Sequence, residues 1–257
     1  MAEPYVIAAH ENNISRLTLN RPRAFNALSE QMLDALQHEL DHLPSDTRVV
    51  VIAANGKAFC AGHDLKQMRQ HTDQDYFEAL FKRCSHLMTT LLTIRQPVIA
   101  EVQGLATAAG CQLVATCDLA VASTSATFAV SGINVGLFCS TPSVALSRNM
   151  NRKRAMQLLM TGDFIDANTA SDWGLINSAV DDNNLSSAVD VLAQKIKAKS
   201  EIAVRTGKEL FYKQLECGVS SAYELAGQAM ACNMMTDDVT EGIDAFIEKR
   251  QPEWRHR

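Results

Sequence analysis

Two continuous apolar runs of strand length constrain the fold of this chain more than any other feature. Residues 48–55 (RVVVIAAN) and 98–102 (VIAEV) do not alternate apolar with polar positions, a pattern typical of strands buried on both faces. Between them, the apolar side chains of residues 77–92 recur at helical spacing. Strands that alternate with helices favour a parallel sheet with helices packed against it. The sequence therefore predicts an α/β fold.

The segments before these runs carry local structural signals. Residues 5–20 alternate apolar positions around a turn at residues 11–13, which predicts a hairpin. Ser29 is a suitable N-cap for a helix whose leucines form one stripe over residues 33–43. We therefore expect a hairpin followed by an amphipathic helix.

One segment, residues 104–123, reaches the length of a membrane span. Gln112 and Asp118 interrupt it, and small residues dominate where a span favours large apolar ones. We expect a tightly packed helix over residues 108–115 that leads into a buried strand over residues 119–123. Asp118 then has a structural, hydrogen-bonding role.

The sequence changes character after Pro142. Six segments there have helical patterns and none is a strong strand: residues 155–160, 167–173, 185–198, 201–215, 222–235 and 239–249. The last third of the chain is therefore predicted to be helical.

Composition limits the size and the partners of the protein. A length of 257 residues suits one large domain, or a main domain with a small appendage. With 47% hydrophobic and 21% charged residues the chain can bury a sizeable core. The net charge of -5 is a poor match for nucleic-acid phosphates or acidic membrane surfaces, so neither is an expected partner.

The cysteines and the N-terminus indicate the compartment. The seven cysteines form no C-x-x-C pair, and the scattered histidines share no ligand spacing with a carboxylate, so no metal site is expected. Residues 1–4 (MAEP) lack the basic and apolar regions of a secretory signal. We predict a cytoplasmic protein, with the mature form of an organellar protein as the alternative.

Two junctions rich in glycine and alanine stand out, because nucleotide-binding loops, zinc-protease motifs and hydrolase elbows are absent from the sequence. Residues 55–66 (NGKAFCAGHDLK) and 102–112 (VQGLATAAGCQ) each follow a buried strand and open a helix. Small residues there let a backbone approach a ligand, and free amides at a helix start bind anionic oxygen. Two tight turns that pack a helix on a sheet are the alternative interpretation.

Taken together, the junctions resemble the crotonase superfamily, also called the enoyl-CoA hydratase/isomerase family. Residues 59–66 (FCAGHDLK) and 104–113 (GLATAAGCQL) match the two family motifs in order and spacing. Further matching segments are 22–28 (PRAFNAL), 117–122 (CDLAVA), 162–167 (GDFIDA) and 173–176 (WGLI). The combination with residues 132–142 (GINVGLFCSTP) looks like one subgroup, the enoyl-CoA hydratase domain-containing protein 3 group.

The resemblance implies an architecture and a substrate. We expect a crotonase-like spiral of ββα turns over residues 1–195 and a C-terminal helical trimerisation region over residues 196–257. The partner is then an acyl- or enoyl-CoA thioester, and the protein is a homo-oligomer, either a trimer or a dimer of trimers. Coenzyme A is part of the substrate, so no separate cofactor is expected.

The resemblance also assigns site residues. The backbone amides of His63 and Ala109 correspond to an oxyanion hole for the thioester carbonyl. The side chain of His63 is expected to be a polar lining rather than a general base. The residues implied to bind substrate are Ala24, Ala61, Gly62, His63, Asp64, Leu65, Lys66, Leu105, Ala109 and Gly110. Lys66 either approaches a phosphate or is simply solvated.

The sequence departs from the family at the catalytic carboxylates. Hydratases of the family use two glutamates, and the matching positions here are Gln112 and Gly132. A carboxylate used elsewhere in the superfamily matches Ser140. Glutamine orients a water but does not take its proton, and glycine does neither. Ser140, Cys139, Ser131 and Asn134 are the polar groups left near the acyl chain, with Cys139 expected to be a buried, inert thiol.

These observations give two functional hypotheses from different classes. The first is an enzyme of the hydratase/isomerase class, formally a lyase, that stabilises a thioester enolate in the oxyanion hole. The second is an acyl-CoA thioester binding protein with little or no turnover. The specificity for the acyl group stays open, because Met32, Met68 and Phe138 are compatible with either a pocket or the core.

Overall fold

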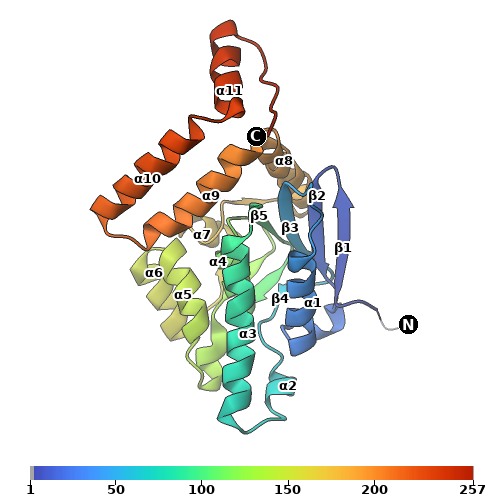
Figure 1. Cartoon of the computed structure of the whole chain (residues 1–257). Coiled ribbons are helices and arrows are strands. Elements are labelled where there is room, and N and C mark those ends of the chain that lie inside the picture. Colours follow the sequence, from blue (N-terminus) through green and yellow to red (C-terminus); the bar gives the residue numbers. More distant parts are fainter. Residues whose placement is uncertain (1–2, 257) are drawn as a thin grey trace.

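The computed structural model describes residues 3–256, in which two sheets are surrounded by helices (Figure 1). Met1 and Ala2, the start of the segment in which no secretory signal was found, lie outside the described residues. The larger sheet has the order β1 (Val6–Glu11), β2 (Ile14–Leu19), β3 (Val49–Ala54), β5 (Val98–Val102), β7 (Leu119–Ser123) and β10 (Ser178–Val180). Strands β1 and β2 form the predicted antiparallel hairpin, and the other neighbours pair in parallel.

The central strands are buried on both faces, as their sequences predict. Val50 and Ile52 of β3 belong to the main core, whereas Val49 and Val51 point to the opposite face and pack with residues of α8 (Leu185–Lys197). Every second side chain of a strand points to the same face, so the run VVVI supplies apolar groups to both layers.

A second sheet consists of short strands in the order β4 (Ala58–Cys60), β6 (Leu105–Thr107), β8 (Thr127–Ala129) and β9 (Ile165–Asp166). Each of β3, β5 and β7 is followed by one strand of this sheet and then by a helix. This repetition is the predicted spiral of ββα turns. The second sheet itself was not predicted, because strands of two or three residues carry no periodic signal.

The helices of the spiral are α1 (Glu30–Asp41), α2 (Leu65–Met68), α3 (Gln74–Thr93), α4 (Ala109–Thr116) and α5 (Ser140–Asn149), with short 3-10 turns η1 (Pro22–Ala24), η2 (Ser131–Val135) and η3 (Asp182–Asn184). The predicted cap of α1 is present, since Ser29 Oγ accepts a hydrogen bond of 3.2 Å from the Met32 amide. The segment that reaches membrane-span length contains the predicted helix, α4, and the predicted strand, β7, and it begins with the short strand β6, which was not predicted. No helix among residues 3–256 combines the length and the apolar character needed to cross a membrane.

The C-terminal third is mostly helical, as predicted. Its helices are α6 (Arg152–Thr161), α7 (Ala167–Asp172), α8, α9 (Glu201–Leu215), α10 (Val219–Asn233) and α11 (Asp237–Glu248), and the short strands β9 and β10 are additions that the sequence did not indicate. Helices α9 to α11 extend away from the sheets as an arm (Figure 1). The predicted boundary after residue 195 falls inside α8, and the division into core and trimerisation region stays a prediction.

Asp118 fastens α9 to the core. Its carboxylate accepts hydrogen bonds from the Val98 amide (2.6 Å), Lys208 Nζ (2.7 Å) and Tyr212 Oη (2.7 Å). Lys208 is only 9% exposed and also donates to the carbonyls of Leu91 and Gln96, both at 2.8 Å. Asp118 thus has the structural role predicted for it.

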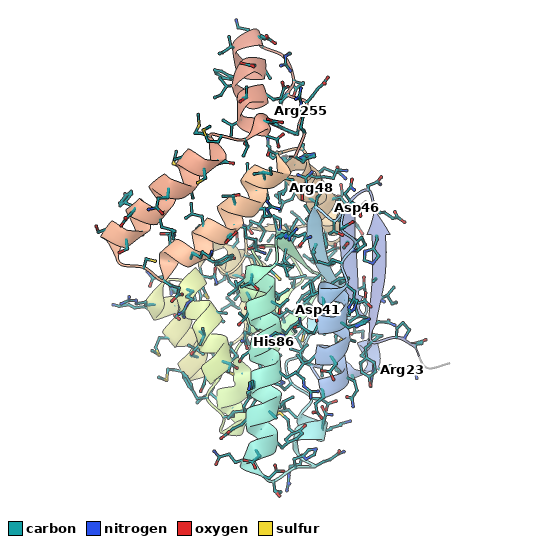
Figure 2. All side chains as sticks on the ribbon, viewed as in Figure 1. Arg23, Asp41, Asp46, Arg48, His86 and Arg255 are labelled. Carbon is teal, nitrogen blue, oxygen red and sulfur yellow. The ribbon has the colours of Figure 1, made fainter. Side chains whose placement is uncertain are left out.

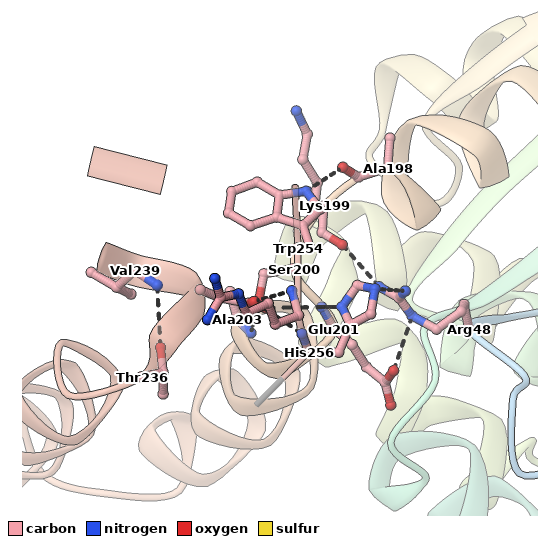
Figure 3. A network of polar contacts seen from close by, with 12 residues as sticks. Arg48, Ala198, Lys199, Ser200, Glu201, Ala203, Thr236, Val239, Trp254 and His256 are labelled. Atoms are coloured by element: carbon pink, nitrogen blue, oxygen red, sulfur yellow. Dashed lines mark hydrogen bonds and ion pairs between the residues drawn. The ribbon is translucent and has the colours of Figure 1, made fainter. Parts of the chain in front are cut away.

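The residues between α11 and position 256 return to the base of the arm (Figure 2), where His256 Nε2 lies 3.4 Å from Arg48 Nη1 (Figure 3). Trp254 Nε1 donates to the Ala198 carbonyl (2.8 Å), and Asp238 Oδ1 accepts from the amides of Arg255 (2.7 Å) and His256 (2.9 Å). The second oxygen of Asp238 accepts from Ser200 Oγ at 2.5 Å. The residues after α11 are therefore pinned to the junction of α8 and α9.

Candidate active site

The neighbouring strands β4, β6 and β8 bring three connecting segments to one edge of the second sheet. These strands are parallel, so their carboxyl ends lie on the same side. The segments that leave them are residues 61–64, residue 108, and residues 130–139. Both glycine- and alanine-rich junctions of the sequence therefore meet at this edge, together with the loop that contains Gly132.

The first two junctions are in close contact. A methyl group added at Gly62 would lie 2.9 Å from Ala108 Cβ and 3.2 Å from the Ala109 nitrogen. Ala108 has a φ of 51°, which is uncommon for a residue with a Cβ, and its amide donates to the Ala129 carbonyl at 3.0 Å. Thr107 Oγ1 and Ser131 Oγ are 2.9 Å apart and link the second junction to the loop of residues 130–139. Backbone strain of this kind is concentrated at functional sites.

The loop of residues 22–28 is attached to the first junction. The Ala61 amide donates to the Phe25 carbonyl (3.0 Å), and the Leu28 amide donates to the Gly62 carbonyl (2.7 Å). Fully buried Asn26 donates from Nδ2 to the carbonyls of Asn55 (2.9 Å) and Ala58 (2.8 Å) and accepts from the Arg21 amide (2.7 Å). Ala24, which the family resemblance assigns to coenzyme binding, is thereby held near the junction.

A cavity of about 290 Å³ opens at this edge of the sheet. Its walls are mainly apolar, with a few hydroxyl groups. The lining residues are Ala61, His63, Leu65, Met68, Phe81, Ala108, Ala109, Ser131, Gly132, Val135, Leu137, Phe138, Cys139, Ser140, Thr141 and Pro142. Ala61, His63, Leu65, Ala109, Gly132 and Ser140 were singled out from the sequence, and the structure brings them together here.

Other residues singled out from the sequence lie beside the cavity without lining it. Asp64 caps α2, since its Oδ1 accepts from the amides of Lys66 (3.0 Å) and Gln67 (3.1 Å), and the Lys66 side chain is exposed. A methyl group at Gly110 would lie 2.0 Å from the Cys60 carbonyl oxygen, so only glycine lets α4 pack this closely. Leu105 is half-buried in β6. The binding roles of these residues, and those of Ala24 and Gly62, stay predictions.

Two backbone amides of residues that line the cavity have no acceptor among residues 3–256. Ala109 is the first residue of α4, and the first amides of a helix lack intrahelical partners. Among the backbone and side-chain hydrogen bonds of residues 3–256, neither the Ala109 amide nor the His63 amide is a donor. Both belong to residues that line the cavity, and neither is engaged with another described residue.

The imidazole of His63 forms part of the cavity wall. Its Nδ1 lies 3.3 Å from the Leu28 carbonyl oxygen, and the ring meets the Phe81 ring edge-on at 5.5 Å between centroids. The other nitrogen, Nε2, is buried and has no hydrogen-bond partner among the described residues. Burial lowers the pKa of His63 below 6.5, a shift that the hydrogen bond with Leu28 partly opposes.

Gln112 and Gly132, at the positions of the family glutamates, differ in their surroundings. Gln112 is 4% exposed and does not line the cavity, and its Oε1 finds no hydrogen-bond donor within the described part of the chain. Gly132 does line it, packed so closely that an added methyl group would lie 2.6 Å from the Leu137 carbonyl oxygen and 2.7 Å from Cys139 Sγ.

Few groups in the cavity can titrate. The lining contains neither Asp nor Glu, so His63 and Cys139 are its ionisable side chains. Burial raises the pKa of the Cys139 thiol, which agrees with the predicted inert thiol. No group of three or more His, Cys, Asp or Glu side chains that would suit a metal ion occurs within residues 3–256.

The structure also separates pocket from core. Met68 and Phe138 line the cavity, whereas Met32 is fully buried elsewhere. Asn134 was grouped with the polar candidates, but its Nδ2 instead points to the Gly162 carbonyl (3.4 Å). Phe81 was not singled out, because on an amphipathic helix a wall residue and a core residue follow the same pattern.

Comparison with known proteins decides the family. The family model described as enoyl-CoA hydratase/isomerase matches residues 9–257. The chain belongs to the enoyl-CoA hydratase/isomerase family. Several relatives are similar over nearly the whole chain, which confirms the resemblance seen in the sequence motifs. Solved structures that are similar to this one confirm the crotonase-like fold.

Three of these relatives show the extent of the similarity. The mitochondrial enoyl-CoA hydratase domain-containing protein 3 of Xenopus laevis is 45% identical over 255 residues, 98% of this chain and 87% of its own length. The crystal structure of the human protein of that name is 44% identical with a TM-score of 0.94, covering 97% of this chain and 100% of that one. The crystal structure of an enoyl-CoA hydratase from Mycobacterium smegmatis is 54% identical, covers 98% of this chain and 99% of its own, and has a TM-score of 0.96.

Proposed function

We propose that this protein is an enzyme acting on acyl- or enoyl-CoA thioesters, with the amides of His63 and Ala109 as its oxyanion hole. The observation that carries the proposal is that both amides lack an acceptor within the described part of the chain and belong to residues lining one apolar cavity. Charge that moves onto the thioester oxygen would be stabilised there. One such donor is typically worth ~10²–10³ in rate, about 2.7–4 kcal/mol.

Hydration by two glutamates is not part of this proposal. Gln112 and Gly132 stand where the family places carboxylates, and two general acid/base groups together supply ~10⁴–10⁸ in rate. Gln112 does not line the cavity, so orienting water or substrate would require its side chain to turn towards it. Ser140, which lines the same cavity, would contact the acyl group without taking a proton.

An acyl-CoA binding protein with little or no turnover is the second candidate function. The absence of carboxylates from the cavity lining favours it. In either case coenzyme A would enter as part of the substrate, with no separate cofactor. The cavity and its apolar rim would hold the acyl group, while Ala24 and Lys66 would lie towards the coenzyme.

The proposed assembly is a trimer or a dimer of trimers formed through the arm. Large apolar side chains on α10 and α11 are exposed in the single chain, including Tyr223 (77%), Met230 (69%) and Phe246 (84%). Exposed apolar surface of this kind marks a site of protein contact. The names of the vertebrate relatives place those proteins in mitochondria, which agrees with the organellar alternative of the sequence prediction.

A panel of enoyl-, acyl- and malonyl-type CoA thioesters, analysed by mass spectrometry after incubation, tests the proposal. Turnover of any member supports an enzyme, and the mass change names the reaction: gain of water, release of free CoA, or loss of carbon dioxide. Recovery of intact, tightly bound thioester throughout would favour the binding protein. A panel that is neither bound nor converted contradicts both functions.

A Gln112→Glu variant separates hydration from other chemistry. It places a carboxylate at one of the two family positions, on a side chain that is 4% exposed and outside the cavity lining, whereas glutamate at Gly132 would collide with the Leu137 carbonyl. If the pocket is otherwise competent for hydration, Gln112→Glu gains water addition to an enoyl-CoA. If the native reaction is different, the variant loses native turnover without that gain.

A further inference from the structure

We propose that a groove between the end of α3 and α9 binds a small molecule that carries phosphate groups, at a site separate from the acyl cavity. The groove lies where the end of α3 meets α9 (Figure 1) and has a volume of about 490 Å³. Small-molecule sites usually occupy about 300–1,000 Å³. We call it the basic groove, and its lining includes Leu92, Ile94, Arg95, Arg205, Tyr212 and Lys213.

The basic groove and the acyl cavity lie at different places along α3. They share no lining residue, and α3 contributes Phe81 to the acyl cavity and Leu92 to the groove. At a rise of about 1.5 Å per residue, positions 81 and 92 are about 16 Å apart along the helix. A ligand in the basic groove is therefore distinct from an acyl group held in the cavity of the same chain.

Cations outnumber carboxylates around the basic groove. Arg95, Arg205 and Lys213 line it, and Glu209 is the one carboxylate residue of its lining. A second, narrow hollow shares Arg95 and Arg205 with the groove and adds one arginine and one glutamate. The two hollows together have four cations and two carboxylates, although the whole chain has a net charge of -5. This local excess of positive charge attracts anions.

The negative groups beside the basic groove already have partners. The last carbonyl oxygens of α3 lack intrahelical donors, and buried Lys208 donates to one of them at 2.8 Å. Glu209 pairs with Lys213 at 2.6 Å, and the glutamate of the narrow hollow, Glu201, pairs with Arg48 at 3.5 Å. The protein therefore does not need Arg95 and Arg205 to neutralise these groups.

Arg95 and Arg205 are the two cations of the groove without a partner. Neither side chain donates a hydrogen bond or forms an ion pair among residues 3–256, and Arg205 acts on Glu209 only beyond ion-pair distance. Both arginines line both hollows, so they belong to the boundary between them. Two neighbouring guanidinium groups repel each other, and an anion bound between them would replace that repulsion with attraction.

The chemistry of the lining favours phosphate. A guanidinium group binds phosphate oxygens through two parallel hydrogen bonds, and a lysine acts as a point charge. Three cations suit a group with several negative charges better than a single carboxylate. Leu92, Ile94 and the ring of Tyr212 offer apolar surface for the uncharged part of the ligand. The Tyr212 hydroxyl donates to Asp118 at 2.7 Å, so this ring is held in place.

Calorimetric titration with inorganic pyrophosphate tests the site. We expect the wild type to bind it with a Kd of about 1 mM or lower, and the affinity to fall as salt is added. Arg95→Gln and Arg205→Gln should each weaken binding about tenfold or more, because each removes charge-assisted hydrogen bonds. Arg152→Gln is the matched control, since Arg152 is exposed on α6, lines neither hollow and should keep the wild-type affinity.

Several results would overturn the inference. They are no binding of pyrophosphate, equal affinity in the wild type and both groove variants, or an equal loss in Arg152→Gln, which would indicate general attraction by charge. Tighter binding of citrate than of pyrophosphate would contradict the choice of phosphate.

Titration of the same variants with butyryl-CoA tests whether the two sites are separate. Its affinity should change less than about twofold, because no lining residue is shared. A parallel loss of butyryl-CoA and pyrophosphate binding would assign the arginines to the substrate site and overturn the inference. Failure of the wild type to bind any thioester would contradict the proposed function and leave the pyrophosphate result unaffected.

Discussion

Replacing Asp118 with alanine tests whether the buried ion pair holds α9 to the core. The substitution leaves the Lys208 ammonium, 9% exposed, without its carboxylate and removes the acceptor of the Val98 amide and the Tyr212 hydroxyl. Removing one partner of a buried pair costs about 3–5 kcal/mol. At about 2–4 °C per kcal/mol for a chain of this size, Tm should fall by about 6–20 °C.

The assay is thermal unfolding for Tm and urea unfolding for the free energy, at fixed protein concentration, for Asp118→Ala, Lys208→Met and the double variant. Once Lys208 is replaced by an apolar side chain, loss of Asp118 no longer strands a charge and should cost much less. Glu209→Ala is the control, since its pair with Lys213 is exposed (62% and 61%) and should be worth less than about 1 kcal/mol. An equal cost of Asp118→Ala with and without Lys208 would refute the reasoning.

The effect should also depend on pH. Burial lowers the pKa of Lys208 below its ordinary 10.5, and Asp118 opposes that shift. In Asp118→Ala the pKa falls further, so the folded state binds fewer protons than the unfolded state at alkaline pH. Stability of the variant relative to wild type should therefore recover as pH rises towards 10.5.

Three further substitutions test the remaining contacts. Asn26→Ala removes three buried hydrogen bonds at a residue with φ 52°, so the free energy of unfolding measured in urea should fall by about 2–4 kcal/mol. Calorimetry should show weaker binding of acyl-CoA to the same variant. Gly132→Ala places a methyl group 2.6 Å from the Leu137 carbonyl and should lower Tm and acyl-CoA affinity together; unchanged values would show that the loop adapts freely. Asp238→Ala should free the residues after α11, seen as faster amide exchange at residues 255 and 256 with little change in the sheets.

The sequence predicted the elements that are marked by an apolar run of strand length, by helical periodicity or by a capping residue. The run VVVIAA of β3 and the cap Ser29 of α1 are local features, so they identify those elements without knowledge of the rest. The second sheet was missed because Ala58–Cys60 and Leu105–Thr107 are too short for a period to show. Their pairing depends on contacts between distant segments.

The candidate site was predicted only in part, because some of its features are local in the sequence and others depend on contacts between distant segments. His63 and Ala109 lie in motifs of small residues, and the resemblance to a family carried the rest. No pattern indicates that the Nε2 of His63 lacks a partner, because this depends on Leu28 and Phe81 from other elements. The tight fit of Gly132 against Leu137 likewise appears only once the loop has its shape.

The hydrogen bond between Trp254 and the Ala198 carbonyl joins two residues that are 56 positions apart. It therefore closes a loop of the chain without a covalent bond. Helices α9 to α11 form the body of that loop. If the residues after α11 were detached, the connections between α9, α10 and α11 would be free to change their backbone angles. With both ends of the segment held, the orientations open to α10 and α11 are already restricted in the single chain. Part of the conformational entropy that assembly would otherwise cost is therefore lost already on folding. An affinity tag or a truncation near residue 256 would disturb the contact between Trp254 and Ala198. Fusions are therefore better placed at the opposite end of the chain.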